Sequence, residues 1–242
     1  MSSDAILLYI LCSLKQLLVS FEKKITKNQK QRMKYADEPE KFMESEIELN
    51  AEIQELFAVA ASPELYPILV QMGSVNSILG MITHENTDIS IATINLLQEM
   101  TDVDSVLEVV DKAMEFINAF VAGQGLELIV QNLSRLDENN EEDAQGVHNS
   151  LAIIENLVEI NPELSVTLCD KTNILKFLLE RLKVKKFDAN KLYCSEILSI
   201  LLQNEKNQLR LCAIAGLDGM DMLLQTIAVY RKKEVDALDE QV

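Results

Sequence analysis

The sequence contains no tryptophan, and aromatic residues make up only 5% of its 242 residues. Glycine occurs 7 times and proline 4 times. These two residues form many of the sharp turns between short strands, so their scarcity argues against a β-sandwich or β-barrel. Hydrophobic residues at 48% and charged residues at 25% are nevertheless typical of a folded globular protein.

Cysteine and histidine are few and scattered. No two cysteines form a C-x-x-C pair, and the only histidines are His84 and His148. The four cysteines are Cys12, Cys169, Cys194 and Cys212. This pattern predicts neither a disulfide framework nor a zinc ribbon, and it favours a reducing compartment.

The sequence also lacks the spacings of known catalytic sites. A Cys194–His148 pair could form in three dimensions, which leaves an unrecognised hydrolase as an alternative. The acidic segment 137–143 lacks the spacing of a calcium loop and is more typical of a solvated loop. We therefore predict that the protein is not an enzyme and has no cofactor and no metal.

Negative charge is concentrated in one part of the chain, whose formal net charge is −17. Residues 1–35 carry 7 basic and 2 acidic side chains, residues 36–165 carry 3 and 26, and residues 166–242 carry 12 and 11. An acidic surface attracts cationic partners and repels phosphates, although it can also serve solubility alone. We predict protein partners with basic segments, and neither direct nucleic-acid binding nor a membrane.

The N-terminal segment is apolar but does not resemble a signal peptide. Asp4 stands where a positive charge is expected, and Lys15 interrupts the apolar run. We expect an amphipathic or buried helix over 5–22. The basic segment 23–36 could be a nuclear-localisation or phosphate-binding patch, but its dispersed lysines favour a solvated helix face. An acidic amphipathic helix is predicted at 40–60.

Apolar residues recur at helical spacing almost throughout, as at Ile89, Ala92 and Leu96. In addition, the string Ser-Pro-Glu-Leu at 62–65 returns as Asn-Pro-Glu-Leu at 161–164. These features predict an all-α fold, an armadillo/HEAT-like α-solenoid of about three and a half helical repeats with an N-terminal helical cap. An ordinary helical bundle is the alternative.

The predicted organisation has three parts: an N-terminal helical cap at 1–61, armadillo-like repeats at 62–230 and a polar tail at 231–242. The repeats are predicted at 62–102, 104–160, 161–203 and, incomplete, 205–230. Their expected helices cover 62–72, 74–83, 87–101, an extended first helix after 104, 125–136, 141–159, 162–171, 173–184, 188–203, 205–215 and 217–230. Helix caps are expected at Asn86 and Asp188, and helix ends at Gly73, Gly125 and Gly216.

The fourth repeat has no third helix, so its apolar side chains have no predicted cover. They are Met220, Leu223, Leu224 and Ile227. We expect this end to be the least stable part of the chain, or to be covered by a second copy in a homodimer.

Five strings of the sequence resemble the beta-catenin-like protein 1 family, in matching order, over about residues 13–228. They are Pro39–Glu46, Asn86–Ala92, Leu128–Glu138, Gly146–Ala152 and Phe187–Glu196. The resemblance implies an armadillo-type nuclear protein that associates with the spliceosome and binds basic, localisation-signal-like segments of splicing factors. Residues 1–12 and 104–124 depart from the family pattern. A generic acidic adaptor, or a truncated variant without spliceosome association, is the alternative.

The candidate binding site lies on the third helices of the repeats, which line the groove of armadillo folds. Peptide-binding members carry a tryptophan there and an asparagine four residues later. Only Asn156 keeps that pattern here. The remaining polar residues form an acidic line suited to lysine or arginine side chains, or else an ordinary solvated face. The acidic line consists of Asn95, Glu99, Asp102, His148, Glu155, Asn156, Glu159 and Glu196.

Overall fold

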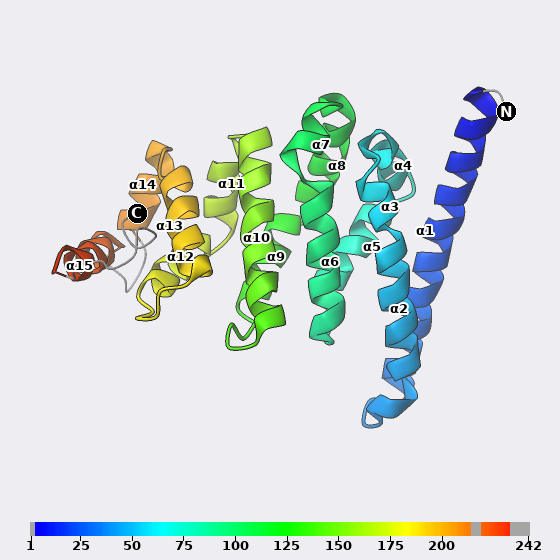
Figure 1. Ribbon diagram of the computed structural model, residues 1–242, viewed down its shortest axis with the longest axis horizontal. Coiled ribbons are helices and arrows are strands. Elements are labelled where there is room, and N and C mark those ends of the chain that lie inside the picture. Colours follow the sequence, from blue (N-terminus) through cyan, green and yellow to red (C-terminus); the bar gives the residue numbers. More distant parts are fainter. Residues whose placement is uncertain (1–2, 214–218, 233–242) are drawn as a thin grey trace. The chain divides into compact units, whose positions relative to one another are not determined.

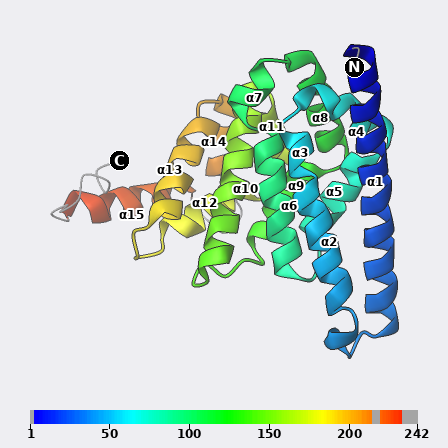
Figure 2. The ribbon, with the colours of Figure 1, turned by 45° about the vertical axis from the view of Figure 1, so that its right-hand side comes forward.

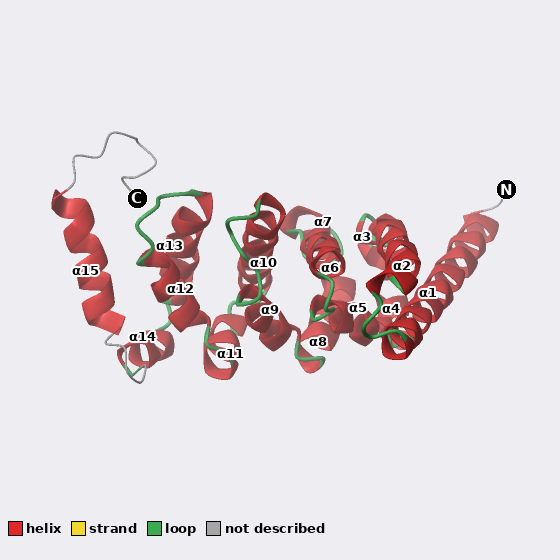
Figure 3. Cartoon of the chain, turned by 90° about the horizontal axis from the view of Figure 1, so that it is seen from below, coloured by secondary structure: helices red, strands yellow, loops and turns green. Residues whose placement is uncertain are grey.

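The computed structural model describes residues 3–213 and 219–232, and all regular structure in these residues is helical (Figure 1). Figure 3 shows only helices joined by loops in this part of the chain. The all-α prediction is therefore confirmed. The chain forms two compact units, unit 1 at 1–128 and unit 2 at 129–242, each considered by itself below.

Unit 1 begins with a long helix hairpin and continues with shorter helices. Its elements are α1 (Ser3–Lys34), η1 (Pro39–Lys41), α2 (Met43–Glu55), α3 (Phe57–Ala60), η2 (Pro63–Leu65), α4 (Tyr66–Gln71), α5 (Ser74–Ile82), α6 (Thr87–Met100), α7 (Val103–Leu107), α8 (Val110–Ala122) and the first residues of α9 (Gly125–Leu133). The two short η elements are 3₁₀ turns, and each begins at a proline.

The helix α1 is continuous through the segment that we expected to divide into an apolar and a basic part. Leu14, Leu18, Phe21 and Ile25 are buried and spaced four, three and four residues apart. This heptad spacing keeps one face of α1 against its neighbours while lysines occupy the rest of the helix. Figure 2 shows α1 and α2 side by side and antiparallel.

Two pairs of packed helices form the core of unit 1. The helix α2 packs against α6, and α4 packs against α8. Tyr66 of α4 is fully buried, and its ring centroid lies 5.1 Å from that of Phe116. Phe116 in turn lies 6.3 Å from Phe120. In a chain with few aromatic residues, this cluster fills much of the space between α4 and α8.

Unit 2 contains the rest of α9 and two further sets of helices. These are α10 (Glu141–Ile160), α11 (Leu164–Lys171), α12 (Ile174–Leu182), α13 (Ala189–Leu201), α14 (Glu205–Cys212) and α15 (Gly219–Lys232). The helix α10 packs against α13, α11 against α14 and α12 against α15. Packing of each helix on its counterpart in the next set is the arrangement expected of stacked repeats.

The helix caps expected at Asn86 and Asp188 are both present. The side-chain oxygen of Asn86 accepts a hydrogen bond from the backbone N–H of Asp88 at 2.9 Å. Asp188 Oδ1 accepts from the backbone N–H of Lys191 at 3.0 Å. Ser62 makes no such bond, so the following proline rather than a cap sets the start of η2.

The glycines act in different ways from one another. Gly73 has a φ of 71° between α4 and α5, as expected for a helix end. Gly125, expected to end a helix, instead begins α9, and the left-handed residue there is Gln124. A Cβ atom at position 125 would lie 2.5 Å from the ring of Phe120, so packing requires this glycine. Gly216 lies outside the described residues.

The helices after residue 62 match the expected ones to within a few residues, with one exception. The extended first helix after 104 is divided into α7 and α8 at Glu108 and Val109. The repeat boundaries themselves stay a prediction. Within the described residues, no single helix is long and apolar enough to cross a membrane. Two bent helix pairs meet that measure together, at 63–82 and 110–133.

Candidate functional site

Unit 1 contributes three residues of the acidic line. Asn95 and Glu99 lie on α6, and Asp102 caps α7 by accepting a hydrogen bond from the backbone N–H of Ser105 at 3.0 Å. Glu99 is exposed, whereas Asn95 and Asp102 are half-buried. Burial raises the pKa of the Tyr66 hydroxyl, and the nearby carboxylates of Asp102 and Glu99 raise it further.

The other five residues of the acidic line belong to unit 2, where Tyr193 of α13 contacts two of them. Its hydroxyl donates a hydrogen bond to Glu155 of α10, and its ring lies 4.8 Å from that of His148. Burial raises the pKa of Tyr193, as do the hydrogen bond to Glu155 and the charge of Glu196. Tyr193 therefore stays protonated and available as a hydrogen-bond donor at neutral pH.

A pocket of about 400 Å³ lies beside these residues. Glu155 and Glu159 supply carboxylates at this pocket, and apolar side chains lie among them. Its lining residues are Glu155, Val158, Glu159, Pro162, Ser165, Ile200, Gln203 and Asn204. Apolar surface beside a carboxylate suits a lysine or arginine, whose aliphatic stem and charged head need both.

The acidic line is thus two groups of residues, one in each unit. Asn156 is half-buried on α10, whereas Glu159 and Glu196 are exposed on α10 and α13. Tyr193, which contacts both His148 and Glu155, was not among the predicted site residues. It lies in the string Phe187–Glu196 that carries the family resemblance.

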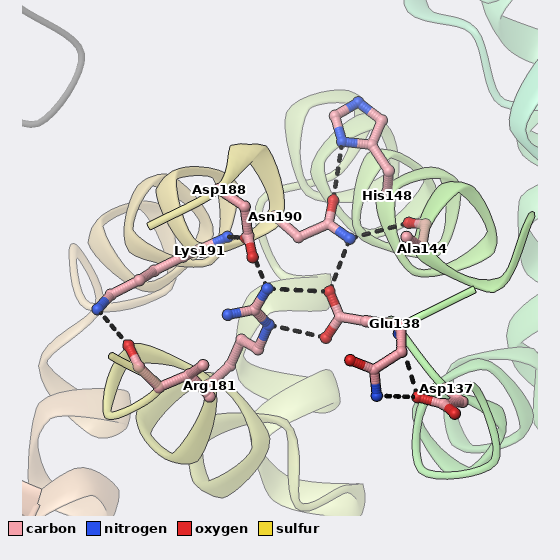
Figure 4. A network of polar contacts seen from close by, with 10 residues as sticks. Asp137, Glu138, Ala144, His148, Arg181, Asp188, Asn190 and Lys191 are labelled. Carbon is pink, nitrogen blue, oxygen red and sulfur yellow. Dashed lines mark hydrogen bonds and ion pairs between the residues drawn. The ribbon is translucent and has the colours of Figure 1, made fainter. Parts of the chain in front are cut away.

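Sequence reasoning also missed a buried polar network in unit 2, which we call the Arg181 network (Figure 4). The side chain of Arg181, on α12, is only 8% exposed. Its Nε donates to Glu138 Oε1 at 2.7 Å, and its Nη2 donates to Glu138 Oε2 at 3.1 Å and to Asp188 Oδ1 at 2.6 Å. The network consists of Glu138, His148, Arg181, Asp188, Asn190 and Lys191.

Asn190 extends this network to α10. Its Nδ2 donates to Glu138 Oε2 and to the carbonyl of Ala144, each at 2.8 Å. Its Oδ1 lies 3.3 Å from Nδ1 of His148. The network therefore ties the start of α13 to the start of α10 through the loop before α10 (Figure 4).

Opposite effects act on the charges of this network. Burial opposes ionisation of Asp188, but hydrogen bonds from Arg181 and from the N–H of Lys191 outweigh it and lower the pKa of the carboxyl. Burial likewise opposes the charge of Arg181, yet Glu138 and Asp188 raise its pKa. Arg181 and Asp188 are therefore both charged at neutral pH and stabilise each other.

Three of the five family-like strings meet in this network. Leu128–Glu138 supplies Glu138, Gly146–Ala152 supplies His148, and Phe187–Glu196 supplies the remaining residues apart from Arg181. The signal for Arg181 was also present in the sequence. It stands seven residues after Ile174 and three after Leu178, on the buried face of α12.

Unit 1 contains a similar cluster, which we call the Arg32 network. Asn28 of α1 is 1% exposed and donates to Ser45 Oγ at 3.0 Å. Its Oδ1 lies 3.0 Å from His84 Nε2, and His84 Nδ1 accepts from the backbone N–H of Asn86 at 3.0 Å. The network consists of Asn28, Arg32, Ser45, Glu46, His84, Glu85 and Asn86.

Arg32 supplies the positive charge of this network. It pairs with Glu46 of α2 and with Glu85 in the loop before α6, and its guanidinium lies 4.6 Å from the centre of the Phe42 ring. Burial lowers the pKa of His84, and the positive charge of Arg32 lowers it further. His84 is therefore neutral at pH 7, with its proton on Nε2, because Nδ1 accepts a hydrogen bond.

The two buried cysteines do not support nucleophilic chemistry. Cys194 is fully buried, and burial raises its pKa to about 12. Burial also raises the pKa of Cys169 to about 12. A thiol with such a pKa is almost wholly protonated at pH 7 and is a poor nucleophile, so the Cys194–His148 pair is unsuited to hydrolysis.

The acidic loop expected at 137–143 is occupied by its own hydrogen bonds. Asp137 Oδ1 accepts from the backbone and side-chain nitrogens of Asn139 at 3.1 and 2.7 Å. Asp143 Oδ2 accepts from the backbone N–H of Asp137 at 2.8 Å. Across the described residues, no group of three or more His, Cys, Asp or Glu side chains is arranged to hold a metal ion.

An apolar hollow of about 520 Å³ lies between α13 and α15. Leu198 of α13 and Leu202 directly after it line one side, and Leu223 and Ile227 line it from α15. Met220, Leu224 and Ile227 are 47%, 56% and 61% exposed, as expected for this end of the chain.

Comparison with known proteins identifies the family. The chain matches the family described as "Catenin-beta-like, Arm-motif containing nuclear" over residues 9–241. Beta-catenin-like protein 1 of Rattus norvegicus and of Homo sapiens are each 49% identical to it over 230 residues, which cover 95% of this chain and 40% of the relative. The beta-catenin-like protein 1 homolog of Schizosaccharomyces pombe is 35% identical over 225 residues, which cover 91% of this chain and 39% of that protein.

The chain thus spans about 40% of the length of these relatives. The family match is wider at both ends than the resemblance predicted at 13–228, and that prediction of the family is confirmed. The helical units, the helix-on-helix packing and the sequence matches agree, and the chain belongs to the catenin-beta-like family of Arm-motif-containing nuclear proteins.

Proposed function

We propose that this chain is a non-enzymatic scaffold that binds basic, localisation-signal-like segments of splicing factors. In this proposal it acts in the nucleus, in association with the spliceosome during pre-mRNA splicing. Its family membership supports a protein-binding role, because armadillo-type helix stacks present long surfaces to other chains. The protonated thiols of Cys169 and Cys194 weigh against the alternative of a hydrolase.

The observation that carries the binding proposal is the pocket beside Tyr193 in unit 2. Glu155 is held in place by the Tyr193 hydroxyl, while Glu159 is exposed on the same helix and Glu196 is exposed on the next. A positioned carboxylate loses less side-chain entropy on binding than a free one. The pocket therefore suits one lysine or arginine side chain, with the outer carboxylates attracting further cations.

The absence of tryptophan fixes the mode of binding that we propose. Basic peptides cannot be held here by lysine stems packed between indole rings, since the sequence has none. Tyr193 and His148 form the aromatic pair nearest to the pocket residue Glu155. Affinity should therefore depend mainly on charge and fall as salt rises, since ions screen exposed charges beyond about 8 Å at physiological ionic strength.

The test is the binding of a lysine- and arginine-rich peptide, measured by fluorescence anisotropy. Glu159→Lys with Glu196→Lys should weaken binding by roughly tenfold or more, because each reversal replaces attraction by repulsion. The matched control is Glu55→Lys with Glu115→Lys, which makes the same change in charge at exposed positions of unit 1. Equal affinity of the two double variants would show that only net charge matters and would refute the site.

The alternative of an acidic adaptor without spliceosome association needs a separate experiment. Pull-down from nuclear extract with the wild-type chain should recover splicing factors, and the Glu159/Glu196 variant should recover fewer. Recovery of basic proteins in general, without enrichment of splicing factors, would support the generic adaptor.

A further inference from the structure

The outer face of α1 carries a line of exposed side chains that the acidic site does not involve. These residues recur three or four positions apart, so they share one face of the helix. They are Leu8, Cys12, Lys15, Val19, Lys23, Thr26, Lys30 and Met33. We call this set the outer line. It faces away from the buried heptad positions that pack α1 against its neighbours in unit 1.

The lysines of α1 divide into two groups. Lys24 and Lys27 face α2 and pair with Glu48, each at 2.8 Å. Lys15, Lys23 and Lys30, on the outer line, are exposed and have no ion-pair partner among the described residues. The second group is available to another molecule without breaking a contact of the fold.

Exposed apolar side chains also belong to the outer line. Leu8 is 63% exposed, Val19 44% and Met33 84%. Exposed Glu22 lies beside Val19 and Lys23, so this face is mainly and not wholly basic. A face that serves solubility alone usually avoids large apolar groups. Lysines at close to heptad spacing, with exposed apolar residues on the same face, are instead what a helix presents to a second helix.

The spacing of the lysines indicates the shape of the partner. Lys15, Lys23 and Lys30 are eight and seven residues apart. That separation is roughly 11 Å along the axis for each step, which is the rise of one heptad. A second helix with a carboxylate in every heptad and apolar residues between would therefore match both the charges and the apolar positions.

The rest of unit 1 disfavours a polymer of phosphates on this face. Residues 36–128 contain 2 basic and 18 acidic side chains. A nucleic acid or an anionic membrane that extended beyond α1 would approach these carboxylates and be repelled. A single acidic helix can be confined to the outer line.

We infer that the outer line of α1 is a docking surface for an acidic amphipathic helix of a partner protein. Lys15, Lys23 and Lys30 pair with its carboxylates, while Val19 and Met33 contact its apolar residues. This surface is separate from the acidic line and selects partners of the opposite charge. A variant that loses binding at one surface should keep binding at the other.

The experiment uses the whole chain and a synthetic helical peptide that carries one glutamate and one leucine on the same face of each heptad. Binding is measured by fluorescence anisotropy at low and at physiological salt. The wild-type chain should bind this peptide and not a matched peptide in which glutamine replaces the glutamates. Lys15→Glu, Lys23→Glu and Lys30→Glu together should reduce the affinity by roughly tenfold or more.

The matched control variant is Lys112→Glu with Lys185→Glu and Lys206→Glu, which changes the net charge equally at exposed lysines elsewhere. It should bind the acidic peptide much more tightly than the outer-line variant, and circular dichroism should be unchanged in both. Equal loss in both variants would overturn the proposal. So would tighter, lysine-dependent binding to single-stranded DNA or to phosphatidylserine vesicles, because either result would assign the surface to phosphates.

Discussion

In unit 1 an arginine of α1 reaches a carboxylate on α2 and another before α6, whereas in unit 2 an arginine of α12 reaches carboxylates before α10 and at the start of α13. Both networks also contain a buried asparagine that meets a histidine. The difference is in solvation. The side chain of Arg181 is 8% exposed, while that of Arg32 is 21% exposed and its partner Glu85 is 82% exposed.

The two networks both hold neighbouring helices together, but the arginine at the centre of each has a different exposure to solvent. The Arg32 network connects the start of α6 to α1 and α2, and the Arg181 network connects the start of α13 to α12 and to the start of α10. Unit 2 does so with a desolvated arginine between two carboxylates, and unit 1 does so with a more solvated arginine and a neutral histidine in the chain of hydrogen bonds. The two units should therefore respond differently to mutation and to pH.

The largest effect is expected from removing the buried arginine. Arg181→Leu leaves Glu138 and Asp188 without their cation and should lower the free energy of unfolding of unit 2 by about 3 kcal/mol. Arg32→Leu should cost unit 1 roughly 1–2 kcal/mol, because its partners are nearer to water. Urea unfolding, with hydrogen exchange to assign the loss to a unit, measures both.

The control for this pair is Arg210→Leu. Arg210 pairs with Asp170 at 2.6 Å, but the two side chains are 30% and 65% exposed, so the loss should be below about 1 kcal/mol. If Arg181→Leu were no worse than Arg210→Leu, the Arg181 network would be a consequence of folding that adds little stability.

The asparagines should give a smaller and more equal effect. Asn28→Ala and Asn190→Ala each remove the side chain that joins the parts of one network and leave buried groups without a hydrogen bond. Each should destabilise its own unit by about 1–3 kcal/mol. Thermal unfolding of both variants tests this expectation. A much larger loss for Asn190 than for Asn28 would show that the networks differ in their hydrogen bonds as well as in their charges.

The response to pH should distinguish the units by its window, because the lowered pKa of His84 acts on unit 1 below about pH 6.5 and the lowered pKa of Asp188 acts on unit 2 only at more acidic pH. The pKa of His84 is lowered below the ordinary 6.5 by burial and by Arg32, despite the opposing charges of Glu46 and Glu85. Unfolded chains then bind more protons than folded ones below about pH 6.5. Stability of unit 1 should be full above that pH and be lost as the pH falls through the lowered pKa of His84.

Thermal unfolding between about pH 7.5 and pH 5 measures this dependence. His84→Gln removes the titrating ring and should flatten it. Hydrogen bonds from Lys24 and Lys27 lower the pKa of the Glu48 carboxyl to about 2. Protonation of this carboxyl therefore changes stability only below about pH 4.5, outside the range that is measured. A wild-type profile that matched the His84→Gln profile would contradict the assigned role of the histidine.

The smallest effect is expected at the end of unit 2. Amides of 205–213 and 219–228 should exchange faster than those of 141–203, because α15 exposes Leu224 and Ile227 beside an apolar hollow. If a second copy covers this face, their exchange should slow as protein concentration rises. Equal protection at all concentrations in a monomer would contradict both the instability and the homodimer that we propose for this end.

The sequence was sufficient to predict most of the helices, because their apolar residues recur every three or four positions and because Asn86 and Asp188 mark helix starts. It was not sufficient to predict that α1 is one continuous helix. The lysines of 23–34 suggested a separate segment, whereas Ile25 and Asn28 continue the buried face beneath them. The spacing of apolar residues indicates the buried face of a helix, but many lysines in the same segment can conceal that spacing.

The two networks could not be predicted for a different reason. Arg181 and Glu138 are 43 residues apart, and they meet only because α12 packs beside the loop before α10. The acidic line shows the same limit. Glu99, Glu155, Glu159 and Glu196 lie on helices, and Asp102 caps one. The hydrogen bond from Tyr193 that positions Glu155 could not be predicted, because it depends on how α10 packs against α13.

The four thiols differ in exposure, so their rates of alkylation can measure how often unit 2 opens. Cys12 of unit 1 and Cys212 of unit 2 are exposed, so a maleimide should modify them quickly. Cys169 and Cys194 are buried in unit 2 and can be alkylated only when that unit opens. Slow incorporation of the third and fourth labels, followed by mass spectrometry, would therefore time the opening of unit 2 without any introduced cysteine.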